Sequence, residues 1–233
     1  MTALFVAKSL IEADSTGRAV VLVVCAEACT LHVSSAVQLE LVVGNAIFGD
    51  GAGAAIVSHA GFRGTSPAKG AALNTGAGVT GADWEWSLGS MSSEIVPDSA
   101  GAMTWKQSAD GGRYDMWLAR TIPQSLTALF STRGFELLSR VGLFNPFGVA
   151  WALHPGGKAI LAGFEEGLAK IGVRPDGLEH SHAVLAEHGN MSSATIFFVL
   201  QRVLSRTTMN AVFFAGFGPG LTVEFGALNR VRK

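Results

Sequence analysis

Residues 19–25 read AVVLVVC, a continuous run of mainly β-branched apolar residues. Such a run is typical of a strand buried on both faces of a sheet. Before it, residues 2–13 (TALFVAKSLIEA) space their apolar side chains along one helix face. After it, residues 45–58 (NAIFGDGAGAAIVS) place a glycine-rich turn ahead of another apolar strand. This order of elements predicts an α/β fold of mixed sheets with helices on both faces.

The later part of the chain repeats the alternation of strands and helices. Residues 59–83 are rich in glycine and other turn-forming residues, so we expect a boundary or surface excursion there. After residues 84–96 and a tight turn at 97–98, the patterns predict a helix from Pro123, a strand at 149–153, helices at 158–171 and 192–203, and strands at 212–217 and 221–228.

Composition excludes several classes of protein. The chain has 233 residues, 48% of them hydrophobic and 15% charged, with a net charge of −1. A disordered chain would have fewer hydrophobic residues and a higher net charge. A protein that binds nucleic acid or anionic lipid through its charge would have an excess of basic residues. Two cysteines make neither a disulfide framework nor a zinc site, and no apolar run reaches the ~18 residues that a membrane span needs. The first residues do not resemble a signal peptide. We therefore expect a cytoplasmic protein with no metal and no membrane span.

Three strings contain the candidate functional residues. His154 ends the strand in WALHPGG, where α/β sheets build their sites. Asn190, in EHGNMSSA, precedes a helix, where an amide could stabilise an oxyanion. The string GFGPG, residues 216–220, predicts a rigid hairpin that could wall a pocket. Each has a plainer explanation: a structural histidine, a helix cap and a tight turn.

Taken together, these strings resemble the chalcone/stilbene synthase family, the type III polyketide synthases. The resemblance includes VCAE at 24–27, the string NAIFGDGAGAAIV at 45–57 and EIVPDSAGAM at 94–103. HPGG, GNMSS and GFGPG complete the set in the family's order. It implies that residues 1–65 are the end of an N-terminal thiolase-like half and that residues 84–233 are the C-terminal half.

The resemblance also implies an activity. The family is a group of acyltransferases that condense an acyl-coenzyme A starter with malonyl-coenzyme A, normally as homodimers, with no further cofactor. His154 and Asn190 match the family's catalytic histidine and asparagine, which assist a cysteine nucleophile. Phe48 and Met116 match gatekeeping positions, and Cys29 and His32 match pocket threonines of plant members. The expected substrate-binding residues are Phe48, Met116, Cys29, His32, Ser192, Gly216, Phe217, Gly218, Pro219 and Gly220.

One departure from the family pattern concerns the nucleophile. The family's cysteine precedes a short glycine-containing turn and then a helix, and TALFVAKSL at 2–10 matches that helix. The resemblance therefore implies that the nucleophile and the first part of the N-terminal half are missing from this chain. Cys25 is not a substitute, because a cysteine that ends a buried strand usually behaves as an inert hydrophobic residue.

Two alternatives stay open at this point. The chain could be a cysteine-less, non-catalytic paralogue or partner subunit, or it could be another thiolase-fold enzyme such as a ketoacyl synthase. The ketoacyl synthases typically lack the GFGPG string, which favours the polyketide synthases. An in-frame cysteine-containing segment in the DNA upstream of Met1 would favour an incomplete synthase over a paralogue.

Overall fold

A computed structural model gives the architecture and describes residues 1–32, 39–59, 71–74, 84–108, 111–112 and 114–232. The helices are α1 (Thr2–Ala13), α2 (Leu39–Ile47), α3 (Ile122–Arg140), α4 (Lys158–Lys170), α5 (Leu178–His188) and α6 (Thr195–Arg206). The strands are β1 (Val20–Ala28), β2 (Asp50–His59), β3 (Ala71–Asn74), β4 (Trp84–Ile95), β5 (Met103–Gln107), β6 (Tyr114–Leu118), β7 (Val149–Leu153), β8 (Ala211–Gly218) and β9 (Thr222–Arg232).

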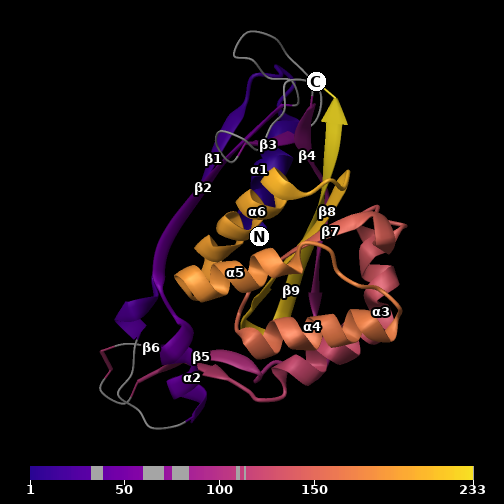
Figure 1. The fold of residues 1–233 in the computed structure, drawn as a ribbon. Helices are drawn as coiled ribbons and strands as arrows, with labels where there is room; N and C mark the ends of the chain where they lie inside the picture. The colour runs from indigo at the N-terminus through magenta and orange to yellow at the C-terminus, as the bar shows by residue number, and fades with distance from the viewer. Residues whose placement is uncertain (33–38, 60–70, 75–83, 109–110, 113, 233) are drawn as a thin grey trace.

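One mixed sheet organises the molecule (Figure 1). Its seven strands follow the order β1-β2-β3-β4-β9-β8-β7. The pair β7–β8 is parallel, and the other neighbours in this sheet are antiparallel. Strands from before and after residues 59–83 therefore belong to the same sheet. The predicted boundary between residues 65 and 84 lies mostly outside the described residues, although β3 shows that this stretch contains a strand.

Helices cover both faces of the sheet, as the sequence predicts. On one face, α1 and α6 bury Leu4, Ile11 and Leu200 against Val57 and Trp86. On the other face, residues of α3 and α4 pack around Trp151, Phe213 and Phe225 of the strands. The helix α5 lies against β7 and α6 and contributes Val184 to the first core and Leu178 to the second. The strand β7 lies between the two cores, which explains why all five of its residues are apolar and buried.

The prediction for residues 19–25 is half wrong. They form a strand, but β1 is an edge strand, and among the described residues it pairs with β2 alone. Val23 is buried, whereas Leu22 is 64% exposed and Val24 is 59% exposed. A run of apolar residues predicts burial on both faces, but the described part of the chain covers one face of β1 only. The outer face of α1 is apolar and exposed too, at Phe5 and Leu10.

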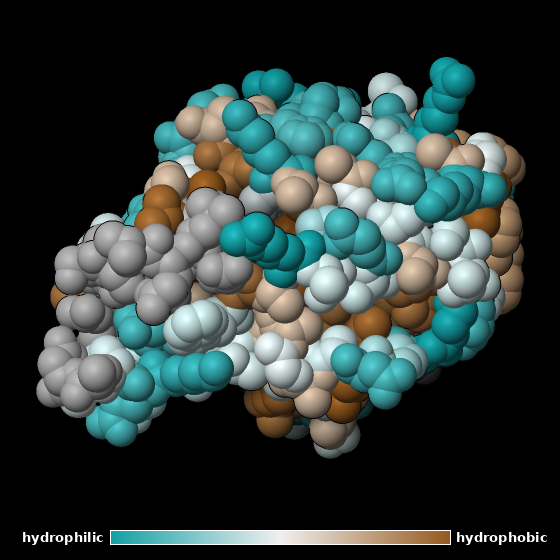
Figure 2. Space-filling model, turned by 90° about the horizontal axis from the view of Figure 1, so that it is seen from below, coloured by the Kyte–Doolittle hydropathy of each residue, from teal (hydrophilic) through white to brown (hydrophobic). Residues whose placement is uncertain are grey.

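A smaller unit lies at the lower end of the molecule in Figure 1. The strands β5 and β6 form a two-stranded sheet, and β6 lies near α2 and the 3₁₀ turn η1 (Cys29–His32). Seen from below, the surface mixes hydrophilic residues with separate hydrophobic patches (Figure 2). No helix in the described ranges combines the length and apolar character needed to cross a bilayer.

Candidate active site

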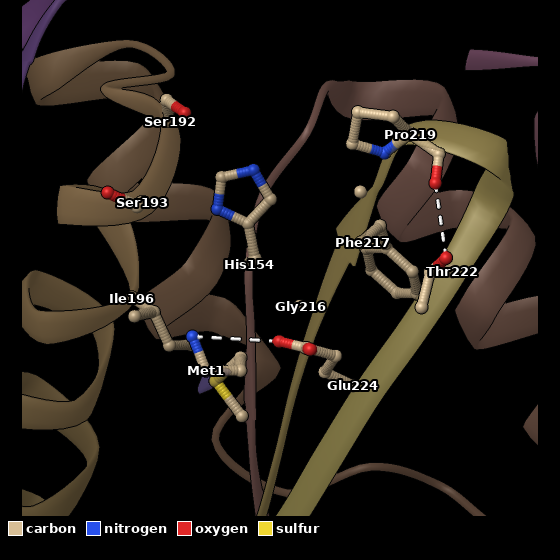
Figure 3. A pocket seen from close by; sticks show the side chains of 11 residues that line it. Met1, His154, Ser192, Ser193, Ile196, Gly216, Phe217, Pro219, Thr222 and Glu224 are labelled. Atoms are coloured by element: carbon tan, nitrogen blue, oxygen red, sulfur yellow. Dashed lines mark hydrogen bonds and ion pairs between the residues drawn. The ribbon is translucent and has the colours of Figure 1, made fainter. Parts of the chain in front are cut away.

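A pocket of about 420 Å³ opens where β7, the β8–β9 hairpin and the starts of α1 and α6 meet. Figure 3 shows the His154 ring between the helical segment of Ser192, Ser193 and Ile196 and the strands of Phe217 and Glu224. The lining residues are Met1, His154, Ser192, Ser193, Ile196, Gly216, Phe217, Gly218, Pro219, Thr222 and Glu224. The pocket thus joins residues from both ends of the chain.

His154 enters the pocket because β7 ends there. Its backbone N–H donates to the Ala215 carbonyl at 2.8 Å, which continues the pairing of β7 with β8 by one residue. The turn Pro155–Gly157 then leads into α4. Burial of the imidazole, and secondly the positive charge of the Met1 ammonium group, lowers the pKa of His154 from 6.5 to about 4. His154 is therefore neutral at physiological pH in this chain.

Asn190 lies beside the turn that follows His154. Its side-chain Nδ2 donates to the Gly156 carbonyl at 3.4 Å, and its Oδ1 accepts from the Ser192 N–H at 2.9 Å. The second bond holds Ser192 at a φ of 49°, a left-handed conformation that is uncommon outside glycine. Asn190 is buried and bonded to the turn that follows His154, but it is not among the residues that line the pocket. That both side chains act on one substrate stays a prediction.

Phe48 contacts the Asn190 segment through the backbone. The two residues form an isolated parallel bridge, in which the Asn190 N–H donates to the Ile47 carbonyl at 2.6 Å and the Gly49 N–H donates to the Asn190 carbonyl at 3.0 Å. A Cβ on Gly49 would lie 2.7 Å from the His188 carbonyl oxygen, and a Cβ on Gly189 would lie 2.7 Å from that of Ile47. Two glycines therefore allow this close crossing of segments 47–49 and 188–190.

Three other predicted pocket residues lie around the small sheet. The His32 ring packs against Trp105 of β5, with centroids 5.0 Å apart, and Trp105 pairs with Met116 of β6. Cys29 is buried at the start of η1. Burial raises the pKa of its thiol to about 11, and the negative charges of Glu27 and Asp50 add to this effect. Cys29 is consequently a poor nucleophile, because the thiolate is the reactive form.

The two cysteines do not line the His154 pocket. Cys25 pairs with Gly53 inside the β1–β2 ladder and packs against the first core. Neither Cys25 nor Cys29 is among the lining residues. The described residues contain no cluster of His, Cys, Asp or Glu suited to hold a metal ion.

The GFGPG hairpin, which the sequence predicts to wall a pocket, forms one side of the His154 pocket. Gly216, Phe217, Gly218 and Pro219 line the pocket, while Gly220 takes a φ of 71° in the turn beyond it. The carbonyl of Gly220 accepts from the Ser99 hydroxyl at 3.1 Å. This bond fixes the hairpin tip to the segment after β4.

Two acidic side chains and the first residue of the chain were missed. Glu224 lines the pocket and contacts Met1 and Thr2, while Glu27 accepts hydrogen bonds from Ser193 on the other wall. Their charge could have indicated them, because each glutamate interrupts an otherwise apolar strand pattern. A buried or half-buried acid in such a position usually has a specific partner. Their partners are 222 and 166 residues away, beyond any local pattern.

Comparison with known proteins gives a consistent result. The family described as "Chalcone and stilbene synthases, C-terminal domain" matches residues 87–231, and the corresponding N-terminal domain matches residues 1–61. The C-terminal type III polyketide synthase domain of Steely1, a type I/III hybrid from Dictyostelium, is 25% identical with a TM-score of 0.78. The alignment covers 99% of this chain and 58% of that one.

A second solved structure, PKS-I from the brown alga Ectocarpus siliculosus, is 22% identical with a TM-score of 0.80. Here 99% of this chain and 57% of the other are covered. The 233 residues thus span less than two thirds of the length of either relative.

Proposed function

The chain belongs to the chalcone and stilbene synthase family of type III polyketide synthases and has their thiolase-like fold, and from this premise we propose that it contributes to the decarboxylative condensation of an acyl-coenzyme A starter with malonyl-coenzyme A. The observation that carries the proposal is the placement of His154 in an open pocket, with Asn190 bonded to the adjacent turn. Both residues match the family's motif positions.

The proposed chemistry needs hydrogen-bond donors at a thioester carbonyl. When the malonyl carboxylate leaves as CO₂, the electron pair of the broken C–C bond moves onto the thioester oxygen and forms an enolate. A neutral His154 and the amide of Asn190 would donate to that oxygen and stabilise its charge. The enolate carbon then attacks the carbonyl of an acyl thioester, and the C–S bond of that thioester breaks, so that its sulfur leaves as a thiolate.

The pocket also indicates where an acyl-carrying thiol would belong. Met1, at the start of α1, lies in the pocket with His154. A residue just ahead of α1 would therefore lie within reach of the imidazole, which agrees with the family's order of cysteine, turn and helix. We propose coenzyme A thioesters as substrates, a homodimer as the working assembly and the cytoplasm as the location.

Phe48 and Met116 are proposed to line the approach to this pocket. The supporting observations are the bridge between Phe48 and Asn190 and the proximity of β6, which contains Met116, to α2, which ends just before Phe48. Methionine has a flexible side chain that adapts to its contents. A long aliphatic acyl group would suit such an approach better than a rigid aromatic one.

A second candidate function is supported by the positions of the thiols. Because neither Cys25 nor Cys29 lines the pocket, a non-catalytic partner subunit that binds acyl-coenzyme A is also compatible with the site. The two candidates differ in their chemistry, since decarboxylation of malonyl-coenzyme A needs the hydrogen-bond donors but no nucleophile.

The decisive experiment follows acetyl-coenzyme A formation from malonyl-coenzyme A by the purified 233-residue chain. We expect formation above background, reduced about 100-fold in His154→Ala and in Asn190→Ala. His182→Ala is the control, because His182 is a half-exposed histidine paired with Glu165 on the surface. Binding of acyl-coenzyme A without any decarboxylation would favour the partner-subunit function.

The same preparation tests the position of the nucleophile. We expect the 233-residue chain to form no covalent acyl adduct with an acyl-coenzyme A, as measured by intact mass, and no condensation product. Product formation that is abolished by Cys25→Ala or Cys29→Ala would show that the nucleophile is one of these two residues. The matched positive test uses a chimera, in which the part of the Steely1 domain that precedes its counterpart of α1 is fused ahead of Met1. This chimera should form the covalent acyl adduct and the condensation product.

A further inference from the structure

The helix α1 begins at the pocket without a cap of its own. No side chain of its own N-cap residue bonds to its first turn, and that turn contains no acidic residue. The first N–H groups of a helix lack partners within the helix, and its N-terminus carries partial positive charge. Some other part of the molecule must satisfy these groups.

Glu224 of β9 supplies the missing cap. One carboxylate oxygen, Oε2, accepts from the Thr2 backbone N–H at 3.0 Å, and the other, Oε1, accepts from the Thr2 hydroxyl at 2.5 Å. The Met1 ammonium nitrogen lies 3.8 Å from Oε2, as the dashed line in Figure 3 marks. Both oxygens of this side chain are therefore directed at Met1, the N-cap residue, and Thr2, the first residue of α1.

The cap coincides with a close packing contact at the pocket wall. Glu224 pairs with Gly216 of β8 in the sheet. A Cβ on Gly216 would lie 3.2 Å from Cγ of Met1, so the glycine leaves room for the start of α1 against the strand. His154 lies in the same pocket. The position of α1 relative to His154 is consequently set through β8 and β9.

The opposite wall repeats the arrangement. Glu27, at the end of β1, accepts from the backbone N–H of Ser193 at 3.3 Å and also from its hydroxyl. Ser193 lies in the short 3₁₀ turn (Ser192–Ala194) that leads into α6. Each wall thus has a strand carboxylate that takes both an N–H and a hydroxyl from one residue at the start of a helix. The strand β1 follows α1 and holds the start of α6, whereas β9 follows α6 and holds the start of α1.

We propose that Glu224 is a positioning residue, which fixes the start of α1 against the His154 pocket and so sets the place of the residue that precedes this helix. The proposal extends the proposed function, because the family's nucleophile belongs on the segment that leads into this helix. Glu224 itself touches no reacting atom in this assignment. Its effect is exerted through the backbone of Thr2 and the packing of Met1.

The test compares Glu224→Ala and Glu224→Gln with the unmodified 233-residue chain. Two readouts report on position: hydrogen exchange at the Leu4 and Phe5 amides, which donate to the Met1 carbonyl, and the NMR resonances of the His154 ring. We expect Glu224→Ala to speed exchange at both amides about fivefold, in the range of a lost helix cap, and to shift the His154 resonances. Glu224→Gln keeps an acceptor oxygen and should retain most of the protection.

Two controls separate local positioning from general unfolding. Glu12→Gln removes an acid of the same helix that pairs with Lys8, and it should change neither readout. The amides of β8 should keep their protection in Glu224→Ala. Unchanged exchange at Leu4 and Phe5 with unchanged His154 resonances would overturn the proposal, and so would a loss of protection throughout the sheet, because that result would make Glu224 a general stability residue.

An activity readout distinguishes this proposal from the proposed function. In the chimera with the Steely1 segment, we expect Glu224→Ala to lower kcat for condensation with little change in KM, because the other lining residues of the pocket are kept. If the chimera with Glu224 intact forms no product, the proposed function fails, while the exchange and resonance measurements still decide the role of Glu224.

Discussion

The protonation of His154 gives a prediction whose size can be worked out. In the folded chain its pKa is about 4, against 6.5 for an ordinary histidine, because of burial first and the Met1 ammonium group second. A histidine whose folded pKa is lowered binds its proton more readily in the unfolded chain. Stability is therefore retained above about pH 6.5 and lost as the pH falls toward 4.

The magnitude follows from the two pKa values. At about 1.4 kcal/mol per pKa unit, the shift from 6.5 to about 4 amounts to about 3 kcal/mol when the pH is below both values. Lowering the pH from 7.5 to 5.0 should reduce the free energy of unfolding by about 2 kcal/mol, because at pH 5.0 the imidazole is mostly protonated in the unfolded chain but not in the folded chain. His154→Gln should remove this contribution.

The assay is urea unfolding, followed by the fluorescence of the five tryptophans, at pH 7.5 and 5.0. The measured quantity is the decrease in the free energy of unfolding between pH 7.5 and pH 5.0. This decrease should be larger for the unmodified chain, and for the surface control His182→Gln, than for His154→Gln. Acetylation of Met1 removes one of the two causes and should raise the pKa of His154 while leaving it below 6.5. Equal pH dependence of the unmodified chain and His154→Gln, or a titration of His154 near 6.5 by NMR, would refute the reasoning.

Three further predictions concern packing, the surface and specificity. Gly163→Ala should lower the free energy of unfolding by about 1–2 kcal/mol, because its Cβ would lie 2.6 Å from the Pro123 carbonyl oxygen and the overpacking cost exceeds the helix-propensity gain. In Gly134→Ala the nearest atom is the tip of the Ile171 side chain, so thermal melts should show no loss of stability for that variant. We expect the 233-residue chain to be poorly soluble, and Leu22→Lys, which places a charge on the exposed face of β1, should reduce its self-association as measured by light scattering. Unchanged scattering would show that association occurs through another surface. In a chimera that turns over, long aliphatic starters should be preferred over aromatic ones, and Met116→Phe should weaken that preference; aromatic starters dominating from the outset would contradict this.

Local sequence predicts the elements that local interactions decide. The helix at 2–13 and the strand at 149–153 have the predicted bounds, since their apolar spacing is strong and turn residues end them. The helix α5 was missed, because LEHSHAVLAEH has few apolar residues and its burial depends on β7 and α6. The strand β3 lies within a glycine-rich stretch and is held by pairing with β2 and β4.

The site divides in the same way. His154 and the GFGPG wall were identified because a strand end and a glycine–proline turn leave a local signal. The capping role of Glu224 could not be identified, because it depends on a contact with Thr2 at the other end of the sequence. The exposure of Leu22 was missed for a related reason: an apolar strand pattern does not tell which of its faces the rest of the molecule covers.

The crossing of segments 47–49 and 188–190 has a consequence for how such chains can change by descent. A side chain added at Gly49 would strike the His188 carbonyl oxygen, and one added at Gly189 would strike the Ile47 carbonyl oxygen, so neither glycine can be replaced without moving the backbone of the other segment. Because the obstructing atoms are main-chain carbonyl oxygens, no change of side chain at residue 47 or 188 relieves either clash. Each glycine is therefore expected to persist in relatives that keep this crossing, although about 140 residues of sequence separate the two positions.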